Sequence, residues 1–319
     1  MFVMIHQTYK EIKHNATLKG KRGIRWLFYV SHQILKELFG EFYEFLCNCG
    51  ICKAKIIVYV DGGIFSQIRK YLIGQIYAQQ GISVGYDLSW YKGKSMDVDN
   101  KYPRYYEIEQ MFQGLKLNTF GSLTTYFYRT FLSYSFSFSE VPPISSHEIA
   151  PIYLGGYPNM SYDILYSQFR KSLLGLKLSN VSKKITKENE KQLNCAVHVR
   201  RGDLAKGDNV WYGGVTDDYF FRAINYVTRH NTSVKFIFFS DEMEYVKSNL
   251  LPKINVDYEL IEGNKAFEDL ILISSCDIVI ASQGSFGKMG AIMNEKSLLI
   301  LQNDKYAERY LTRPNTIAI

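Results

Sequence analysis

The decapeptide CAVHVRRGDL, residues 195–204, ends an apolar run in two arginines, a glycine and an aspartate. Side chains alternate along a strand, so His198 and Arg200 project to the same side near its carboxyl end. Ligands of open parallel sheets bind at that end. A guanidinium group offers a planar fork of donors that suits phosphate oxygens, and Asp203 is placed to hold a neighbouring arginine by a salt bridge. The segment predicts a phosphate-binding turn, and a structural salt-bridge cluster is the alternative.

The tripeptide Arg201-Gly202-Asp203 also matches an adhesion motif. Adhesion requires a mobile exposed loop, whereas this tripeptide follows directly on a buried strand, so we set the adhesion reading aside.

Two glycine-containing turns lead from a predicted strand into a predicted helix. The first carries Gly62 and Gly63 and is a weak signal, because many α/β proteins have such turns. The second turn offers free backbone N–H groups and the positive end of a helix dipole, which would suit an anion. Taken alone, this segment fits an ordinary capped helix start equally well. Its candidate binding residues are Ser282, Gly284, Ser285 and Phe286.

Strands and helices alternate in two series, separated by a Lys-rich stretch near residues 180–192. Such alternation predicts parallel sheets covered on both faces. The predicted parts are a helical extension at 1–54 and two Rossmann-like domains at 55–185 and 186–319. Residues 82–107 and 139–160 are expected to be irregular, because they are rich in polar residues or in Pro and Gly.

The N-terminal region pairs a basic lead with an amphipathic helix over residues 26–46. Such a combination can lie on an anionic membrane surface, so peripheral membrane contact through residues 1–46 is one expectation. Packing on the protein body or in an oligomer is the other.

Composition narrows the class of protein. The chain has 319 residues, 46% of them apolar, and a net charge of +7, which fits a globular protein with a phosphorylated substrate or a membrane surface as partner. The absence of an arginine-rich arm argues against nucleic acid. Five cysteines and no secretory signal indicate a cytoplasmic location. The spacing Cys47-x-Cys49-x-x-Cys52 lacks a fourth ligand, so free thiols are favoured over a metal site.

Several segments together resemble the α1,2-fucosyltransferase family, glycosyltransferase family 11. VHVRRGDL followed by NVWYGGVTDDYFFRAI resembles the family's HxRRxD region, FIFFSDE its strand ending in Ser-Asp, and EDLILISSCDIVIASQGSFGKMGA its third motif. Gly62–Gln67 resembles a Gly-Gly-x-Gly-Asn-Gln turn, with Phe65-Ser66 in place of Gly-Asn. This resemblance spans residues 55–300. Because the departure at Phe65-Ser66 lies in its N-terminal part, on the acceptor side, the acceptor is the part of the function that the resemblance defines least.

The resemblance implies a GT-B-like fold with two domains facing a cleft, and inverting, metal-independent transfer of L-fucose from GDP-β-L-fucose. It implies Arg200 on the β-phosphate, Arg201 and Asp203 shaping the loop, and His198 and Asp269 near the nucleoside. The serine and glycine turn at 282–286 would line the phosphates, with Gly62 and Gly63 closing from the other domain. The implied acceptor is O-2 of a galactose in a surface polysaccharide or O-antigen, as in lipopolysaccharide biosynthesis.

The general base stays open among Asp61, Glu107 and His147, since carboxylates and imidazole are the usual candidates. Asp97-Val98-Asp99 has the spacing of a metal-binding motif but stands in a polar segment rather than at the end of a strand, which disfavours a metal-dependent enzyme. Two alternatives remain: a transferase of the same fold with another nucleotide-sugar, and a non-catalytic nucleotide- or glycan-binding protein.

Overall fold

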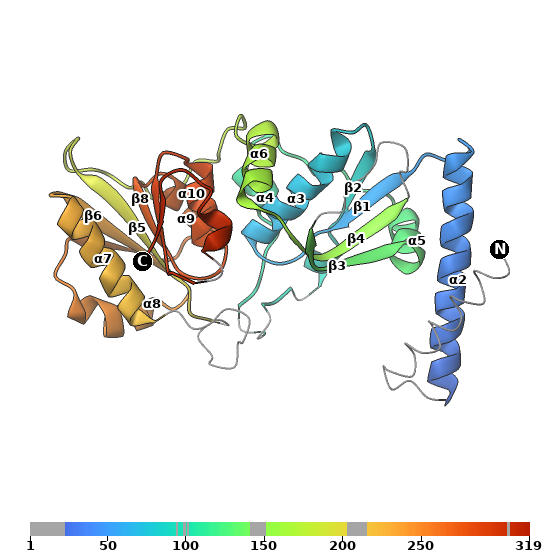
Figure 1. Ribbon diagram of the computed structural model, residues 1–319, viewed down its shortest axis with the longest axis horizontal. Coiled ribbons are helices and arrows are strands. Elements are labelled where there is room, and N and C mark those ends of the chain that lie inside the picture. Colours follow the sequence, from blue (N-terminus) through green and yellow to red (C-terminus); the bar gives the residue numbers. More distant parts are fainter. Residues whose placement is uncertain are drawn as a thin grey trace. The chain divides into compact units, whose positions relative to one another are not determined.

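The computed structural model describes residues 23–93, 95–97, 100, 102–140, 151–202, 216–304 and 307–319. Contacts divide the chain into two compact units (Figure 1). The first unit contains Met1–Tyr59, Ile73–Asp87 and Asn118–Asn159, and the second contains Val60–Leu72, Leu88–Leu117 and Met160–Ile319. The domain boundaries at residues 54 and 185 stay predictions from the sequence.

The first unit is built on a four-stranded sheet. Its strands are β1 (Lys55–Tyr59), β2 (Ser83–Asp87), β3 (Ser133–Glu140) and β4 (Ile152–Asn159), in the order β2-β1-β4-β3. Every neighbouring pair is parallel. The three central residues of β1 are fully buried, as expected for a strand inside a parallel sheet.

Two helices of the first unit pack together beside this sheet. α2 (Gly23–Asn48) contains the whole predicted amphipathic segment, and α5 (Ser122–Phe131) lies against it. A third helix, α3 (Ile64–Ala78), follows the glycine turn after β1. Among the described residues, no helix is long and apolar enough to cross a membrane.

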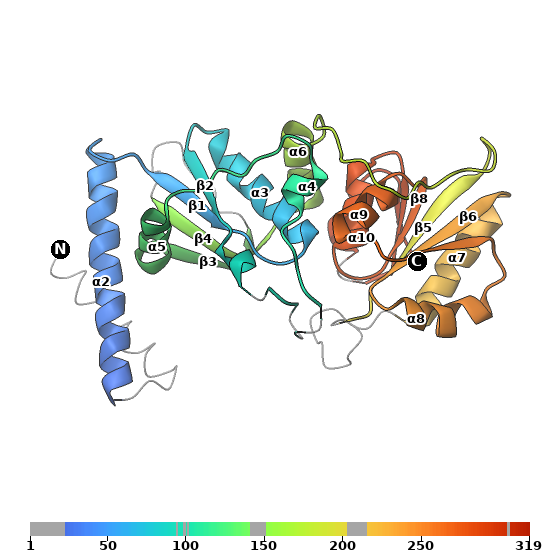
Figure 2. The ribbon, with the colours of Figure 1, turned by 180° about the vertical axis from the view of Figure 1, so that it is seen from behind.

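The second unit is built on a six-stranded parallel sheet (Figure 2). Its strands run in the order β10-β9-β8-β5-β6-β7. Chain order therefore proceeds outward from β5 in one direction and then outward from β8 in the other, which is the strand order of a Rossmann fold. The strands are β5 (Leu193–Val199), β6 (Val234–Ser240), β7 (Tyr258–Ile261), β8 (Ile278–Ala281), β9 (Leu298–Leu301) and β10 (Thr316–Ala318).

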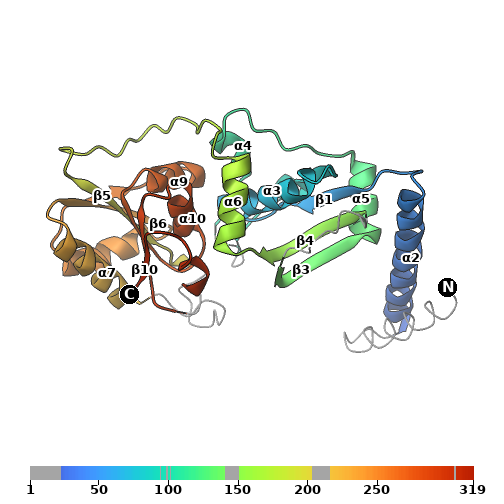
Figure 3. The ribbon, with the colours of Figure 1, turned by 45° about the horizontal axis from the view of Figure 1, so that its top comes forward.

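Helices cover both faces of the six-stranded sheet (Figure 3). One face packs on α7 (Asp217–His230) and α8 (Met243–Tyr245), which continues into a π-turn at Val246–Leu250. The other face packs on α9 (Ala266–Ser274) and α10 (Phe286–Met293). Shorter helices, α4 (Ile108–Met111) and α6 (Tyr162–Ser172), complete the unit.

Alternation along β5 decides which side chain meets which layer. Cys195, Val197 and Val199 pack in the α7 layer, whereas Ala196 packs in the α9 and α10 layer. The predicted α/β class with parallel sheets and a helical N-terminal extension is confirmed.

Two predictions of irregular structure are wrong. Residues 82–107 contain β2, and residues 139–160 contain β4. The polar composition of residues 82–107 and the Pro and Gly content of residues 139–160 misled these predictions, and each strand also contains glycine, which lowers strand propensity. In β2, an added Cβ at Gly85 would lie 2.6 Å from the Phe120 ring, so close packing requires glycine there. In β4, Gly155 and Gly156 pair in register with β3 despite their low propensity.

A buried arginine caps the C-terminal end of α10 in the second unit. Arg313 is 2% exposed, and its Nη2 donates to the carbonyl oxygens of Ala291, Asn294 and Ser297 at 2.9–3.0 Å. These carbonyls lie at the end of α10 and just beyond it. The guanidinium therefore adds a charged donor to buried acceptors at the end of the helix, where carbonyl groups lack part of their intrahelical hydrogen bonds.

We predict that Arg313→Met lowers the free energy of unfolding by about 3 kcal/mol, because several buried carbonyls lose a charged donor. The control is Arg222→Met, whose side chain is 48% exposed and pairs only with Asp218 on the surface of α7. That variant is expected to change stability by less than about 1 kcal/mol. Urea unfolding measures both, and equal losses would contradict the capping role of Arg313.

Candidate active site

The candidate site lies where the strand order of the six-stranded sheet reverses. β5 and β8 are neighbours in the sheet. The helix that follows β5 and the helix that follows β8 cover opposite faces of the sheet. The Ser282 N–H donates to the carbonyl oxygen of His198 at 3.1 Å, and Ser282 Oγ accepts from the Arg200 N–H at 3.0 Å. Ser282 thus joins the two strand ends at the switch point, where ligands of open α/β sheets bind.

His198 is buried at this junction. It is 6% exposed, its Nδ1 lies 3.2 Å from Ser282 Oγ, and its ring stacks at a tilt on Phe286. Burial, followed by the charges of Arg200 and Lys288, lowers the pKa of His198 to about 3. The imidazole is therefore neutral at physiological pH and acts as a packing and hydrogen-bonding group rather than as a cation.

Arg200 is held by an aspartate from the next strand. Its Nη1 lies 2.6 Å from Oδ2 of Asp241, which follows the end of β6. Oδ1 of the same carboxylate accepts from the Arg201 N–H at 2.9 Å. Burial raises the pKa of Asp241, while Arg200 acts in the opposite direction. The Asp241 carboxylate thus fixes the Arg200 guanidinium near the carboxyl ends of β5 and β8.

Gly202 is required by this arrangement. Its φ is +23°, and an added Cβ would lie 2.6 Å from Asp241 Oδ2. A side chain at this position would displace the carboxylate that orients Arg200.

Arg201 has a different environment from Arg200. Its guanidinium lies 3.7 Å from the centroid of the Tyr245 ring. The Tyr245 hydroxyl in turn donates to Asp217 at 2.7 Å. A cation–π contact of this kind anchors the turn on the α8 side of the sheet. Asp203, the expected partner of the arginines, lies outside the described residues.

The second turn forms the start of α10. Gly284 has φ of +90°, in the left-handed region, and Ser285 is the N-cap without a side-chain capping bond. The first backbone N–H groups of α10 thus begin next to Ser282 with the positive end of the helix dipole. Arg200 and this helix start both favour an anion at the strand ends.

Gly287 lets α10 approach the imidazole closely. An added Cβ would stand 3.0 Å from three atoms of His198. Close packing of α10 on His198 therefore requires a glycine at position 287, the second residue of this helix.

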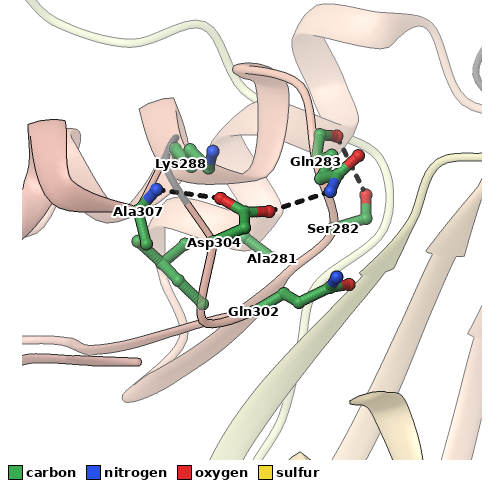
Figure 4. Close-up of a pocket in the computed structure, with 8 residues that line it drawn as sticks. Ala281, Ser282, Gln283, Lys288, Gln302, Asp304 and Ala307 are labelled. Atoms are coloured by element: carbon green, nitrogen blue, oxygen red, sulfur yellow. Dashed lines mark hydrogen bonds between the residues drawn. The ribbon is translucent and has the colours of Figure 1, made fainter. Parts of the chain in front are cut away.

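A small pocket lies beside Ser282 at the carboxyl ends of β8 and β9 (Figure 4). Gln283 Nε2 donates to Asp304 Oδ2 at 2.8 Å, and the N–H of Ala307 donates to Oδ1 of the same carboxylate at 3.0 Å. Burial lowers the pKa of Lys288 to about 8, and Asp304 partly offsets this effect. The Asp304 carboxylate thus bonds other groups of the same pocket, which also contains the Lys288 ammonium.

Asp269 makes its contacts apart from the β5–β8 junction. It lies on α9, and its Oδ1 accepts from Asn264 Nδ2 at 3.0 Å. Burial raises its pKa to about 6, with Asn264 and Lys183 acting in the opposite direction. A role of Asp269 at the nucleoside stays a prediction.

The turn with Gly62 and Gly63 is fixed by one buried amide. Gln67 Nε2 donates to the carbonyl oxygens of Gly62 and Tyr105, and Gln67 Oε1 accepts from the N–H groups of Glu107 and Ile108 at 2.8 and 3.0 Å. Gly62 has φ of +77°, which glycine adopts readily. The donor-closing role of Gly62 and Gly63 stays a prediction.

Two of the three candidate bases have structural partners. Glu107 is 4% exposed, and burial raises its pKa to about 7, against hydrogen bonds from the backbone of Phe267 and Ala266 at the start of α9. Asp61 lies 3.9 Å from the buried ammonium of Lys70. His147 lies outside the described residues. The identity of the base stays open.

The candidate metal motifs contribute no described site. Asp97 is 9% exposed and accepts from the Tyr102 N–H, whereas Val98 and Asp99 lie outside the described residues. Cys47, Cys49 and Cys52 are free thiols. Within the described ranges, no cluster of three or more His, Cys, Asp or Glu side chains is placed to hold a metal ion.

Sequence reasoning missed Asp241, Tyr245 and Gln67 as site residues. Asp241 had a signal, because it ends the strand FIFFS, and β6 is the neighbour of β5. Gln67 also had a signal, because it is the last residue of the glycine turn Gly62–Gln67 that resembles the family's turn. Tyr245 had none, since it acts through a contact with a residue far away in the sequence.

These features can be set beside known proteins. The sequence profile of the family described as "Glycosyl transferase family 11" matches residues 108–318. The chain belongs to glycosyltransferase family 11. The glycine turn at Gly62 and Gly63 precedes the matched range.

One curated relative is an alpha-1,2-colitosyltransferase of Escherichia coli, 29% identical over 109 residues. The alignment covers 33% of this chain and 38% of that protein, so the chain spans less than half of the relative's length.

Solved structures give more distant similarities. One is NodZ alpha-1,6-fucosyltransferase soaked with GDP-fucose, at 13% identity and a TM-score of 0.47, over 79% of this chain and 96% of that one. Another is a mutant of FUT1 from Arabidopsis thaliana in complex with GDP, at 11% identity and a TM-score of 0.44, over 85% of this chain and 78% of that one.

We predict a measurable pH signature of buried His198. Its folded pKa of about 3 lies below the unfolded value of 6.5, so the unfolded chain binds an extra proton as pH falls through that window. Between pH 7 and pH 5 this costs about 2 kcal/mol of the free energy of unfolding. The raised pKa values of Glu107 and Asp269 have the opposite effect, because they increase the free energy of unfolding as the pH falls. The contribution of His198 is therefore isolated by comparing the wild type with a variant that lacks this histidine.

The test is urea unfolding of the wild type and His198→Gln at both pH values. The variant is expected to lose about 2 kcal/mol less than the wild type between pH 7 and pH 5. Any pH-independent cost of the substitution cancels in this difference. Identical losses would show that His198 is not held neutral by burial.

Proposed function

We propose that the chain is an inverting, metal-independent fucosyltransferase that uses GDP-β-L-fucose as donor. Support comes from family membership and, above all, from Arg200 held by Asp241 at the strand ends beside the start of α10. This arrangement suits a leaving diphosphate, because oriented donors and a helix dipole stabilise negative charge without a metal.

The proposed reaction has one bond-breaking and one bond-forming event at the anomeric carbon. The bond from fucose C1 to the β-phosphate oxygen breaks, and GDP leaves with the electron pair. The acceptor hydroxyl oxygen bonds to C1 from the opposite face, which inverts the configuration. The hydroxyl proton passes to a base that we leave unassigned. Arg200 would bind the β-phosphate, while Ser282, Gly284, Ser285 and Phe286 would line the phosphates.

The nucleoside and acceptor parts of the proposal rest on the resemblance. His198 and Asp269 would lie near the guanosine, Arg201 and Asp203 would shape the loop, and Gly62 and Gly63 would close on the donor. The proposed acceptor is O-2 of a galactose in a surface-polysaccharide or O-antigen glycan. The cytoplasmic location stays a prediction, and for residues 1–46 membrane contact stays one of two alternatives, beside packing on the protein body or in an oligomer.

One observation supports an alternative candidate for the donor sugar nucleotide. The curated relative is a colitosyltransferase, and colitose is L-fucose without its 3-hydroxyl group. GDP-L-colitose is therefore the alternative donor of the same site. A donor comparison separates the two: kcat/KM higher for GDP-fucose supports the first proposal, and kcat/KM higher for GDP-colitose supports the second. Binding of GDP without turnover of either donor would instead indicate a non-catalytic protein.

We predict that Arg200→Ala lowers kcat for GDP-fucose by at least about 100-fold, because a charged donor to the leaving group is lost. The single variant also leaves the Asp241 carboxylate without its cation and is expected to lower the unfolding temperature. Arg200→Ala combined with Asp241→Asn removes both charges. This double variant is expected to regain most of the unfolding temperature while kcat stays low.

The matched control is Arg229→Ala, which removes an exposed arginine in the last turn of α7. Its kcat and unfolding temperature are expected to stay near those of the wild type. A double variant with near-normal kcat would contradict the phosphate role of Arg200 and leave it a purely structural residue.

A further inference from the structure

Helix α2 carries an exposed apolar stripe with a regular spacing. Starting at Ile24, successive positions follow at intervals of four, three, four, three, four and three residues. All seven side chains are exposed, and six of them are apolar, with Ser31 as the exception. Two further apolar side chains of α2, Leu27 and Phe39, are exposed at flanking positions. The stripe, called here the α2 seam, consists of Ile24, Phe28, Ser31, Leu35, Leu38, Phe42 and Phe45.

The rotation of α2 is fixed by a different face of the helix. Phe39 packs on Phe131 of α5 at 5.0 Å between ring centroids, and Tyr43 packs on Tyr128 at 5.9 Å. Lys36 Nζ donates to the carbonyl oxygen of Ser133 at 3.0 Å. These contacts hold α2 on the first unit, so the α2 seam faces outward while α2 is docked.

Exposure of the α2 seam is costly in water. Phe28 is 72% exposed, Phe42 59% and Phe45 60%. Full burial of one large apolar side chain contributes about 1.5–3 kcal/mol. Six such side chains on one helix face form a contiguous surface that a binding partner would stabilise.

The spacing identifies the kind of partner. Alternating intervals of four and three residues are those of a coiled-coil seam, in which side chains insert between those of a second helix. A lipid surface requires only a broad apolar face and no such repeat. Moreover, Glu37, Glu41 and Glu44 are exposed in the same half of the helix as Phe42 and Phe45, and they would repel an anionic membrane.

Charge indicates both the partner and its direction. The chain is basic at the start of α2 and just before it, where Lys21, Arg22 and Arg25 lie, and acidic in the second half of α2. Two antiparallel copies bring the basic start of one helix beside the acidic end of the other. Two parallel copies bring like charges together. We propose that the α2 seam binds the α2 seam of a second copy of this chain, antiparallel, to form a two-fold symmetric dimer.

The proposal is independent of the transferase reaction, and its test needs no substrate. Light scattering after size-exclusion chromatography measures the mass of the full chain, whose monomer is 37.0 kDa. We expect a dimer at micromolar concentration. Leu35→Glu combined with Phe42→Glu is expected to weaken dimerisation at least about 100-fold, because charges enter an apolar seam.

A matched control makes the same substitution elsewhere. Leu174→Glu changes an exposed leucine just after α6, in the second unit, and is expected to leave the dimer intact. Circular dichroism and the unfolding temperature verify that the seam variant stays folded, as exposed positions predict. A seam variant that is folded and still fully dimeric would overturn the proposal.

Direction is tested with native and introduced cysteines. Position 25 and Cys47 are about 33 Å apart along one helix, so a short bismaleimide cannot join them within one copy. In an Arg25→Cys variant, antiparallel copies are expected to give cross-links between position 25 and Cys47 of two chains. Cross-links of Cys47 to Cys47 instead would show a parallel pair and overturn the antiparallel arrangement.

Vesicle flotation tests the alternative that the α2 seam binds a lipid surface. With vesicles containing anionic phosphatidylglycerol, the wild type is expected to stay unbound. A monomeric wild type that floats with these vesicles, and loses this binding in the seam variant, would assign the α2 seam to a lipid surface. A monomeric wild type without vesicle binding would equally contradict the dimer.

Discussion

The junction between β5 and β8 is the constraint on which the candidate site depends. These parallel strands are neighbours, yet the helices that follow them cover opposite faces of the sheet. The chain must therefore leave the two strand ends in opposite directions, which opens a place for a ligand. Ser282 spans this opening through the backbone of His198 and Arg200, so the position of both residues follows from the strand pairing.

The junction combines a neutral imidazole, a buried lysine and an arginine that a carboxylate holds in place. Burial keeps His198 neutral and lowers the pKa of Lys288 to about 8. Asp241 orients the guanidinium of Arg200 through an ion pair. The result is a fixed cation beside a helix start, and this combination supports the proposed role in diphosphate binding.

The sequence predicted the second unit closely, because its strands are apolar runs that end at distinctive polar turns. The order of His198, Arg200, Ser282 and Phe286 along these turns was enough to place them together, since parallel strands share one carboxyl edge. The first unit was harder, because β2 and β4 contain glycines whose need arises only from packing and pairing. Asp241 and Gln67 stand in recognisable motifs, but their partners lie in distant segments, so residue spacing along the chain does not reveal what they hold. The same is true of Tyr245, which stands in no such motif.

The central claim is that Arg200 binds the diphosphate of a guanine nucleotide without a metal. The most direct measurement is isothermal titration calorimetry of GDP, GMP and UDP with the wild type and with the Arg200→Ala and Asp241→Asn double variant, all in EDTA. The account predicts that GDP binds the wild type more tightly than GMP or UDP does. It also predicts that the double variant loses the preference for GDP over GMP. Tighter binding of UDP, binding that requires Mg²⁺, or an unchanged preference for GDP in the double variant would contradict the account.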